Sequence, residues 1–236
     1  MHRFFLAQKL SDKEIIFLKD KALVHQIKRV SRLHKGDHIA LFNTIEGEEG
    51  TDVVAEIKNI EGSSIGLLVK ERLENLREST KHLTLYCALI RKERFEWMLE
   101  KATEAGVREF VPFVAARSVR KNIQRARCET IIKEAMEQSG RAIIPHLYDP
   151  ISFEQAIEQS AASQRKTFFA ARSERDNMIR GAGDRYVNLF IGPEGGWDPK
   201  EIFLAREAHC EIVSLGRLTL RAETAAVVGS YTLLWG

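Results

Sequence analysis

Apolar runs typical of strands alternate with runs typical of helices along the last third of the chain. Residues Tyr186–Ile191 are rich in β-branched and aromatic side chains, which predicts a buried strand that ends at Gly192. Asp198 is followed by a proline and, three residues on, by Glu201, which is the pattern of a helix N-terminus. Residues 193–197 are therefore predicted to form a short strand-to-helix turn.

A second segment repeats this design. Residues 211–215 have the pattern of a strand, residues 216–221 of a loop, and the chain from Thr224 onward that of a helix. No charged residue occurs from Thr224 to Gly236, so this helix needs cover on nearly every side. Burial inside the domain or against a second subunit meets that need, and we favour a homodimer. Gly229 inside the helix predicts that another backbone packs closely there.

The rest of the chain divides near residues 70–81, where a charged stretch breaks the preceding alternation. Before it lie short strands separated by glycine-rich turns, such as 38–42 and 53–57, which predict a small barrel. After it we expect strands at 83–90, 110–115 and 167–171, and helices at 92–105, 125–139 and 153–159. This alternation predicts a mostly parallel sheet with helices on both faces. Ligands bind beyond the carboxyl ends of such strands, where both loops fall.

Glycines in the two loops permit positive φ angles or the close approach of another molecule. A purely structural turn also explains such loops. Neither G-x-G-x-x-G nor G-x-x-x-x-G-K-[ST] occurs here, which disfavours a dinucleotide or a triphosphate. A ligand recognised through backbone groups, such as an adenine ring with its ribose, remains compatible with the loops.

Composition limits the class of protein without naming a function. With 236 residues, 44% of them hydrophobic, the chain can bury one sizeable core or two modest ones. Its apolar runs are too short for a membrane span or a secretory signal, so we expect a cytoplasmic protein. Cys87, Cys128 and Cys210 match neither a metal signature nor a disulfide framework, and we expect buried, reduced thiols and no metal.

Basic residues form two local clusters, although the net charge is only +3. The first cluster comprises Lys28, Arg29, Arg32 and Lys35, and the second comprises Arg117, Arg120, Lys121, Arg125 and Arg127. Each could be a solvated face. We predict instead that they contact phosphates, so that affinity for nucleic acid falls steeply with salt.

Several motifs together resemble the RsmE family of ribosomal RNA uridine N3-methyltransferases, within the SPOUT superfamily. The matching segments are Arg3–Phe5, His25–Asp37, Glu100–Val107, Pro112, Glu134–Arg141, Pro145, Ile191–Trp197 and Leu215–Ala225. The resemblance implies an α/β fold with a PUA-like RNA-binding β-barrel at residues 1–72 and a SPOUT methyltransferase domain at 73–236. It further implies that the C-terminal part is threaded into a trefoil knot that binds S-adenosylmethionine.

The resemblance also implies which residues hold the cofactor. They are Ile191, Gly192, Pro193, Glu194, Gly195, Gly196, Leu215, Gly216, Leu218, Leu220, Thr224 and Ala225. For the chemistry, uridine N3 must lose its imide proton, or the anion must be favoured by a cation near the uracil oxygens. Arg221 and Glu223 are the candidates for these tasks, with Glu194 as a third acid. In a purely structural alternative, Arg221 caps carbonyls or bridges subunits and Glu223 stabilises the start of its helix.

Further candidates face the RNA. Glu134, Gln138 and Arg141 are spaced to share one face of a helix, which is either an exposed polar face or part of the substrate side. The RNA-binding candidates are Arg3, Arg29, Arg32, Arg117, Arg120, Lys121, Arg125, Arg141 and Arg172.

The function we expect is methylation of N3 of a uridine in 16S ribosomal RNA, free or within the small ribosomal subunit. One alternative is a SPOUT enzyme that methylates another position, such as a ribose 2′-hydroxyl. The other is a non-catalytic RNA-binding or ribosome assembly factor.

Overall fold

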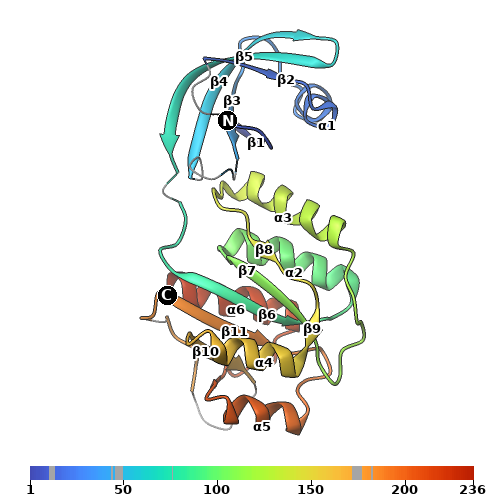
Figure 1. Ribbon diagram of the computed structural model, residues 1–236, viewed down its shortest axis with the longest axis vertical. Helices are drawn as coiled ribbons and strands as arrows, with labels where there is room; N and C mark the ends of the chain where they lie inside the picture. The colour runs from blue at the N-terminus through green and yellow to red at the C-terminus, as the bar shows by residue number, and fades with distance from the viewer. Residues whose placement is uncertain (11–13, 44, 46–49, 76, 172–176, 182) are drawn as a thin grey trace. The chain divides into compact units, whose positions relative to one another are not determined.

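The computed structural model describes residues 1–10, 14–43, 45, 50–75, 77–171, 177–181 and 183–236. The chain folds into two compact units (Figure 1). Unit 1 comprises Met1–Glu78 together with Met136–Ile144, and unit 2 comprises Ser79–Ala135 together with Pro145–Gly236. Within the described ranges, no helix is both long enough and apolar enough to cross a lipid bilayer.

Unit 1 is built on a five-stranded sheet with the order β1-β3-β4-β5-β2. Its strands are β1 (His2–Phe5), β2 (Ile15–Leu18), β3 (His38–Phe42), β4 (Thr51–Glu61) and β5 (Ser64–Glu74). β1 runs parallel to β3, whereas the other neighbours are antiparallel. In the described part of the chain, β1 and β2 each pair with one strand, so the sheet has two edges and closure into the predicted barrel is not seen.

Alternation of apolar and polar positions explains this sheet. In β4, every second residue from Val53 to Ile57 is buried, and β3 and β5 add Leu41 and Leu67 to the same core. A short helix, α1 (Lys21–His25), follows the capping side chain of Asp20 and continues as a π-helical turn. The predicted boundary at residues 70–81 includes the division between Glu78 and Ser79, and β5 extends into this stretch as far as Glu74.

The end of helix α3 (Arg125–Ser139) and the residues after it belong to unit 1. Arg3 donates to the carbonyl oxygen of Met136 over 3.3 Å, and the Phe5 amide donates to Glu137 over 3.1 Å. Gly140, with φ of 77°, follows the helix end. Arg141 therefore lies beyond the helix, and the expectation that it shares a helical face with Glu134 and Gln138 was wrong.

Unit 2 contains a parallel sheet with the order β12-β10-β11-β6-β7-β8, and β9 also pairs with β7. The strands are β6 (His82–Ala88), β7 (Glu109–Val114), β8 (His146–Leu147), β9 (Ile151–Ser152), β10 (Lys166–Ala170), β11 (Tyr186–Ile191) and β12 (Glu211–Val213). All their pairings are parallel, which confirms the mostly parallel sheet predicted from the sequence.

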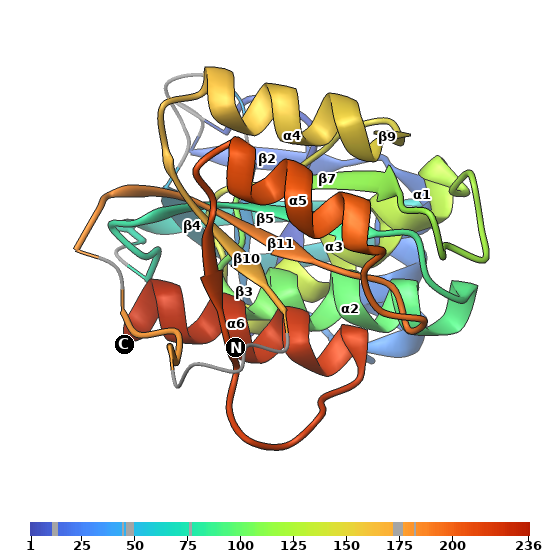
Figure 2. The same ribbon diagram turned by 90° about the horizontal axis from the view of Figure 1, so that it is seen from below.

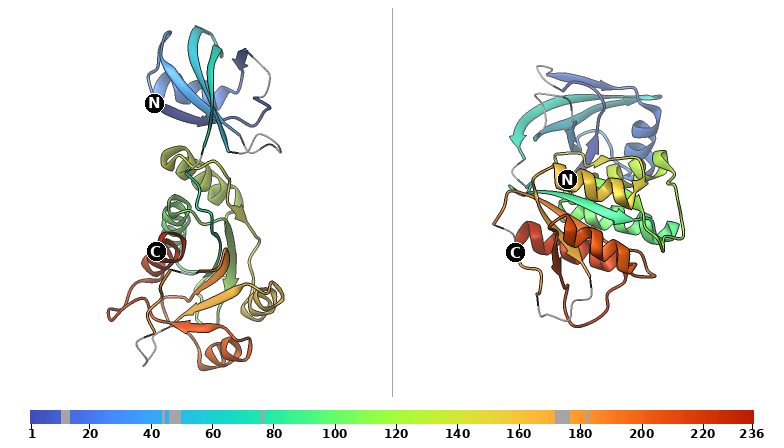
Figure 3. Two further views of the ribbon diagram at one scale, coloured as in Figure 1. Left: turned by 90° about the vertical axis from the view of Figure 1, so that its left-hand side faces the viewer. Right: turned by 60° about the horizontal axis from the view of Figure 1, so that its bottom comes forward.

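Helices cover both faces of this sheet (Figures 2 and 3). α4 (Phe153–Ala162) and α5 (Pro199–Glu207) lie on one face, and α2 (Lys92–Ala105) and α6 (Ala222–Trp235) lie on the other. Phe113, Phe153 and Phe190 pack together in the core beneath α4 and α5. The parallel arrangement brings the carboxyl ends of the strands to one edge of the sheet, where a ligand site is expected.

The packing of helix α6 explains why the C-terminal residues carry no charge. The helix packs against α2 and the sheet, and Leu233 and Leu234 are buried. Gly229 faces the side chains of Leu189 and Leu215, so the expectation of a neighbouring backbone was wrong. The other side of α6 presents exposed apolar side chains from Val228, Tyr231 and Trp235.

The three cysteines are free and buried, as the sequence predicted. Burial raises the pKa of the Cys210 thiol to about 11. These thiols are therefore inert packing groups at neutral pH.

Candidate functional site

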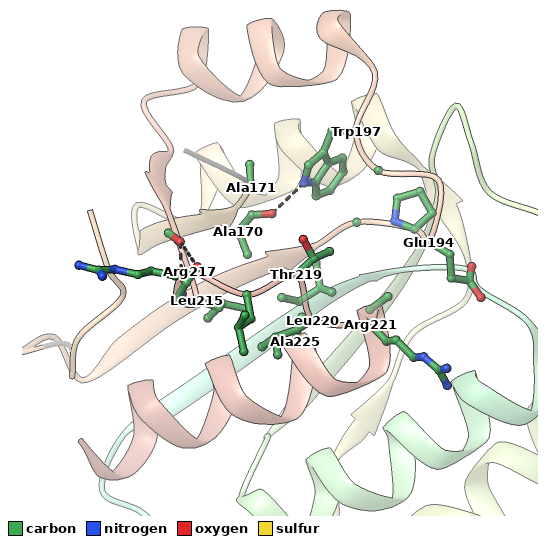
Figure 4. A pocket seen from close by; sticks show the side chains of 18 of the residues that line it. Ala170, Ala171, Glu194, Trp197, Leu215, Arg217, Thr219, Leu220, Arg221 and Ala225 are labelled. Atoms are coloured by element: carbon green, nitrogen blue, oxygen red, sulfur yellow. Dashed lines mark hydrogen bonds between the residues drawn. The ribbon is translucent and has the colours of Figure 1, made fainter. Parts of the chain in front are cut away.

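A cavity of about 390 Å³ lies at the carboxyl edge of the parallel sheet in unit 2 (Figure 4). Residues after β10, β11 and β12 line it, together with the first turns of α2 and α6. Its volume falls within the range of sites for small organic ligands, roughly 300–1,000 Å³. The two loops singled out in the sequence thus meet at one cavity.

The first loop, residues 192–197, is anchored by Trp197. The indole donates to the carbonyl oxygen of Ala170 over 2.8 Å and stacks on Phe169 with ring centroids 4.2 Å apart. Gly192 lies against the ring so closely that an added Cβ would approach Trp197 to 2.7 Å. Gly196 has φ of 72° and donates to the carbonyl oxygen of Pro193, which closes a tight turn. The loop is held rigidly by an aromatic anchor on one side.

The second loop, residues 214–221, forms the opposite wall. The Ser214 hydroxyl donates to the carbonyl oxygen of Gly216 and accepts from the Gly216 amide, and Gly216 has φ of 122°. Leu218 is 83% exposed. Arg217 and Arg221 extend in opposite directions from the two ends of the loop (Figure 4). Helix α6 begins after Arg221 without a side-chain cap.

Charged groups gather at the end of the cavity that holds Glu194 and Arg221 (Figure 4). Arg94 in the first turn of α2 donates to Glu194 over 3.3 Å, and its Nε lies 3.8 Å from a carboxylate oxygen of Glu223. The Glu223 side chain is only 9% exposed, and its Oε2 has no hydrogen-bond partner among the described residues. Arg221 has no ion-pair partner within the described part of the chain. The site thus combines the guanidinium of Arg221 with two carboxylates, Glu194 and Glu223, that both lie near Arg94.

Most of the predicted cofactor residues line the cavity. Those that do are Ile191, Gly192, Pro193, Glu194, Gly196, Leu215, Gly216, Leu218, Leu220 and Ala225. Gly195 and Thr224 are not among the lining residues. Of the predicted catalytic residues, Arg221 and Glu194 line the cavity, whereas Glu223 lies beside it in the buried first turn of α6.

Two predicted RNA contacts are held inside unit 1 instead. Arg3, whose side chain is 7% exposed, pairs with Asp52 over 2.8 Å and lies over the Phe42 ring. Arg141 pairs with Glu78 over 3.1 Å, with its side chain 6% exposed. Neither guanidinium faces solvent, so both serve the fold of this unit.

The remaining candidates for RNA binding differ in their exposure and in whether their side chains already have partners. Arg29, Arg32 and Lys121 are exposed and Arg120 is partly so. Arg117 donates to the carbonyl oxygen of Gly195 on the first loop, and Arg125 binds the carbonyl oxygen of Leu147 and pairs with Glu129. Arg172 lies outside the described residues.

Arg94, Ala170 and Ala171 also line the cavity, although they lie outside the two predicted loops. No motif marks them. However, Arg94 follows β6, and the two alanines lie at the end of β10. The rule that ligands bind beyond the carboxyl ends of parallel strands could have pointed to these positions.

A separate cluster lies at the amino ends of the strands, away from the cavity. Glu109 Oε2 lies 3.2 Å from His82 Nε2 and accepts from Arg165 over 2.9 Å, and the Thr84 hydroxyl also donates to it. The contact with His82, together with those to Thr84 and Arg165, holds the pKa of Glu109 well below its usual range. This cluster ties three strands together.

Comparison with known proteins identifies relatives of the whole chain. Residues 77–233 match the family described as RNA methyltransferase domain. The chain is 30% identical to ribosomal RNA small subunit methyltransferase E of Bacillus subtilis, over 86% of this chain and 83% of that protein.

Solved structures agree with this relationship. The crystal structure of ribosomal RNA small subunit methyltransferase E from Neisseria gonorrhoeae bound to S-adenosyl methionine superposes with a TM-score of 0.86. It is 27% identical, and the match covers 98% of this chain and 95% of that one. A Legionella pneumophila protein solved with the bound cofactor SAM gives a TM-score of 0.82 at 26% identity, over 97% and 95% of the two chains. From the shared domain, the near full-length similarity and the matching fold, we conclude that the chain belongs to the ribosomal RNA small subunit methyltransferase E family.

Proposed function

We propose that the protein is an S-adenosylmethionine-dependent methyltransferase that modifies N3 of a uridine in 16S ribosomal RNA. Family membership supports methyl transfer to small-subunit ribosomal RNA, and two similar structures carry the cofactor. The observation that carries the choice of N3 is the guanidinium of Arg221, which has no ion-pair partner among the described residues and lies at the rim of a cavity that also holds an acid. A cation and a base are what the acidic imide of uracil requires.

The cavity fits S-adenosylmethionine. Its size suits a nucleoside with a short side chain, and its glycine-rich loops present backbone groups without a phosphate cradle. A side chain at Gly216 would project into open space, so glycine there leaves room beside the loop. The residues proposed to hold the cofactor are the predicted set from Ile191 to Gly196 and from Leu215 to Ala225. When bound, the cofactor supplies a methyl group activated by a sulfonium.

Arg221 is proposed to stabilise the uridine anion. As the N3 proton leaves, negative charge spreads onto the uracil carbonyl oxygens, and a guanidinium near them lowers the free energy of that state. The uncapped amides at the start of α6 add a partial positive charge at the same rim. Removing one such donor costs about 10²–10³ in rate in well-studied enzymes.

Glu223 and Glu194 are the proposed acceptors of the N3 proton. Glu223 is buried, and one of its carboxylate oxygens accepts no hydrogen bond from the described residues, whereas Glu194 is more exposed. A buried carboxylate oxygen without a partner is available to accept a hydrogen bond from a bound N–H group. We therefore favour Glu223 as the acceptor.

The finer features of the fold are part of the proposal. We infer a PUA-like RNA-binding module at residues 1–72, a SPOUT domain at 73–236, and a trefoil knot in the C-terminal part that joins the two cavity loops. Arg29, Arg32, Arg120 and Lys121 are the best phosphate ligands, because they are at least partly exposed. We also propose a homodimer formed through the exposed apolar side of α6.

Methyl transfer from labelled S-adenosylmethionine to 16S RNA and to isolated small subunits tests the function. We expect label in ribosomal RNA and a reverse-transcription stop at one uridine, because N3-methylation blocks the Watson–Crick edge. Label without a stop would point to a ribose 2′-hydroxyl, and failure to bind the cofactor would point to an assembly factor.

The role of Arg221 is tested in the same assay. Arg221→Met should lower the single-turnover rate by about 10²-fold with cofactor affinity little changed. Arg206→Met, on the exposed side of α5, is the matched control and should retain the wild-type rate. Equal rates for the two variants would exclude Arg221 from the chemistry.

A further inference from the structure

Arg94 is the one arginine at the cavity that has acidic partners among the described residues. It stands in the first turn of α2 and reaches Glu194 on the first loop and Glu223 on α6. Three segments far apart in the sequence therefore meet at this guanidinium. Its planar set of five N–H donors can serve two carboxylates at once, which a lysine does only as a point charge.

Glu223 has an incomplete set of interactions. Oε1 faces Arg94, whereas Oε2 is buried without a hydrogen-bond partner in the described part of the chain. Buried carboxylate oxygens are costly when they accept no hydrogen bond. Arg221, Ala222 and Ala225 of the same helical turn line the cavity, so the Glu223 carboxylate lies directly beside it. An N–H group is the complement that Oε2 lacks, and the imide of uracil carries one.

Arg94 affects its two partners unequally. Glu194 is 24% exposed, so solvent screens much of its attraction to Arg94. Glu223 is 9% exposed, and without the cation its charge would be buried alone. Such a side chain turns toward water, and in that orientation it cannot accept a proton from a substrate beside the cavity.

We propose that Arg94 is a positioning residue that acts through Glu223. The guanidinium holds the Glu223 carboxylate in place, so that Oε2 accepts the N3 proton of the substrate uracil. The N3–H bond breaks, an O–H bond forms at Oε2, and the electron pair stays on N3. This inference rests on the proposed function and adds to it the residue that maintains the base.

A double-mutant cycle tests the coupling in single-turnover methyl transfer. Arg94→Met should reduce the rate by about 10²-fold, the lower end of what a general base contributes. Arg94→Lys should recover most of the rate, because it restores a cation beside Glu223. In a Glu223→Gln background, Arg94→Met should cost no more than about threefold, because its target is already gone.

Two comparisons make the test specific. Lys92→Met, which removes a cation that pairs with Glu96 in the same turn of α2, should retain the wild-type rate. In a Glu194→Gln background, Arg94→Met should keep its full effect. The proposed role of Arg94 is overturned if the effect of Arg94→Met on the rate disappears in Glu194→Gln and persists in Glu223→Gln. It is also overturned if calorimetry shows that Arg94→Met acts mainly by weakening cofactor binding. Arg94→Gln replaces the methionine variant if that variant does not fold.

A readout without turnover separates this inference from the proposed function. In protein carrying ¹³C in the glutamate carboxyl groups, the Glu223 resonance can be identified by its loss in Glu223→Gln. Arg94→Met should move it away from its wild-type position, because the carboxylate loses its charged neighbour, and Arg94→Lys should move it less. An unchanged resonance refutes the electrostatic link even if methyl transfer occurs. A moved resonance in a protein without methyl transfer would instead leave the link intact and reject the function.

Discussion

Trp197 determines the shape of the cavity at the scale of single residues. Its indole is fixed by Ala170 and Phe169, and Gly192 fills the small space left beside the ring. The φ angle of Gly192 is not positive, so backbone conformation does not require glycine here. Glycine is required because a larger residue would collide with the Trp197 side chain. The first wall of the cavity therefore depends on the absence of a single methyl group.

Gly192→Ala should damage ligand binding more than folding. The new Cβ would lie 2.7 Å from the Trp197 ring, so the anchored indole or the loop must shift. Overpacking of this kind costs about 1–3 kcal/mol. We expect the affinity for S-adenosylmethionine, measured by calorimetry, to fall by at least about tenfold. Gly183→Ala is the control, because a Cβ there meets nothing within 4 Å. Unchanged affinity in Gly192→Ala would mean that the loop adapts freely.

Local chemistry in the sequence predicted some residues of the site and not others. The cap at Asp198 and the glycines of the turn follow from backbone rules that act over a few residues. Arg94 could not be assigned in this way, because its partners are 100 and 129 positions away along the chain. The burial of Arg3 and Arg141 was missed for the same reason, since their acids come from other elements.

At the scale of elements, the bounds of the amphipathic helices were predicted most accurately. The bounds of α2 and α3 agree with the predicted ranges, and α5 begins at the predicted cap. Strand ends were less predictable. β5 extends into the charged stretch at residues 70–81 because it stays paired with β4 as far as Glu74. Pairing with a neighbour thus outweighed local sequence preference.

Glu109 should make the sheet of unit 2 sensitive to acid. Because its folded pKa is depressed, its contribution to stability is complete above the unfolded pKa and is lost as pH falls through the folded value. Glu109→Gln should therefore destabilise the protein by about 2 kcal/mol at pH 7. The difference from wild type should shrink below roughly pH 4. Denaturant unfolding at several pH values measures it, and a difference that stays constant with pH would contradict this account.

At the scale of the whole molecule, periodicity predicted a mostly parallel sheet with helices on both faces, and the structure confirms it. Periodicity could not show that residues 136–144 belong with the N-terminal strands, because segments distant in the chain create that unit. Chain threading is equally invisible to local patterns, so the knot rests on resemblance.

The proposed dimer is a whole-molecule prediction. Val228 and Tyr231 are 40% and 60% exposed on one side of α6, which is a poor surface for a monomer in water. Light scattering should give twice the chain mass of 26.9 kDa for the wild type. Val228→Glu with Tyr231→Glu should give the monomer mass. Phe203→Glu, on exposed α5, should leave the dimer intact. A monomeric wild type would disprove the dimer.

The contribution of residues 136–144 to unit 1 has a consequence for biosynthesis. This segment accepts hydrogen bonds from Arg3, Phe5, Gln26 and Asn75. A ribosome makes the first 78 residues well before it reaches the segment. The N-terminal unit therefore cannot complete its fold as it emerges, and it must wait until more than half of the chain has been translated.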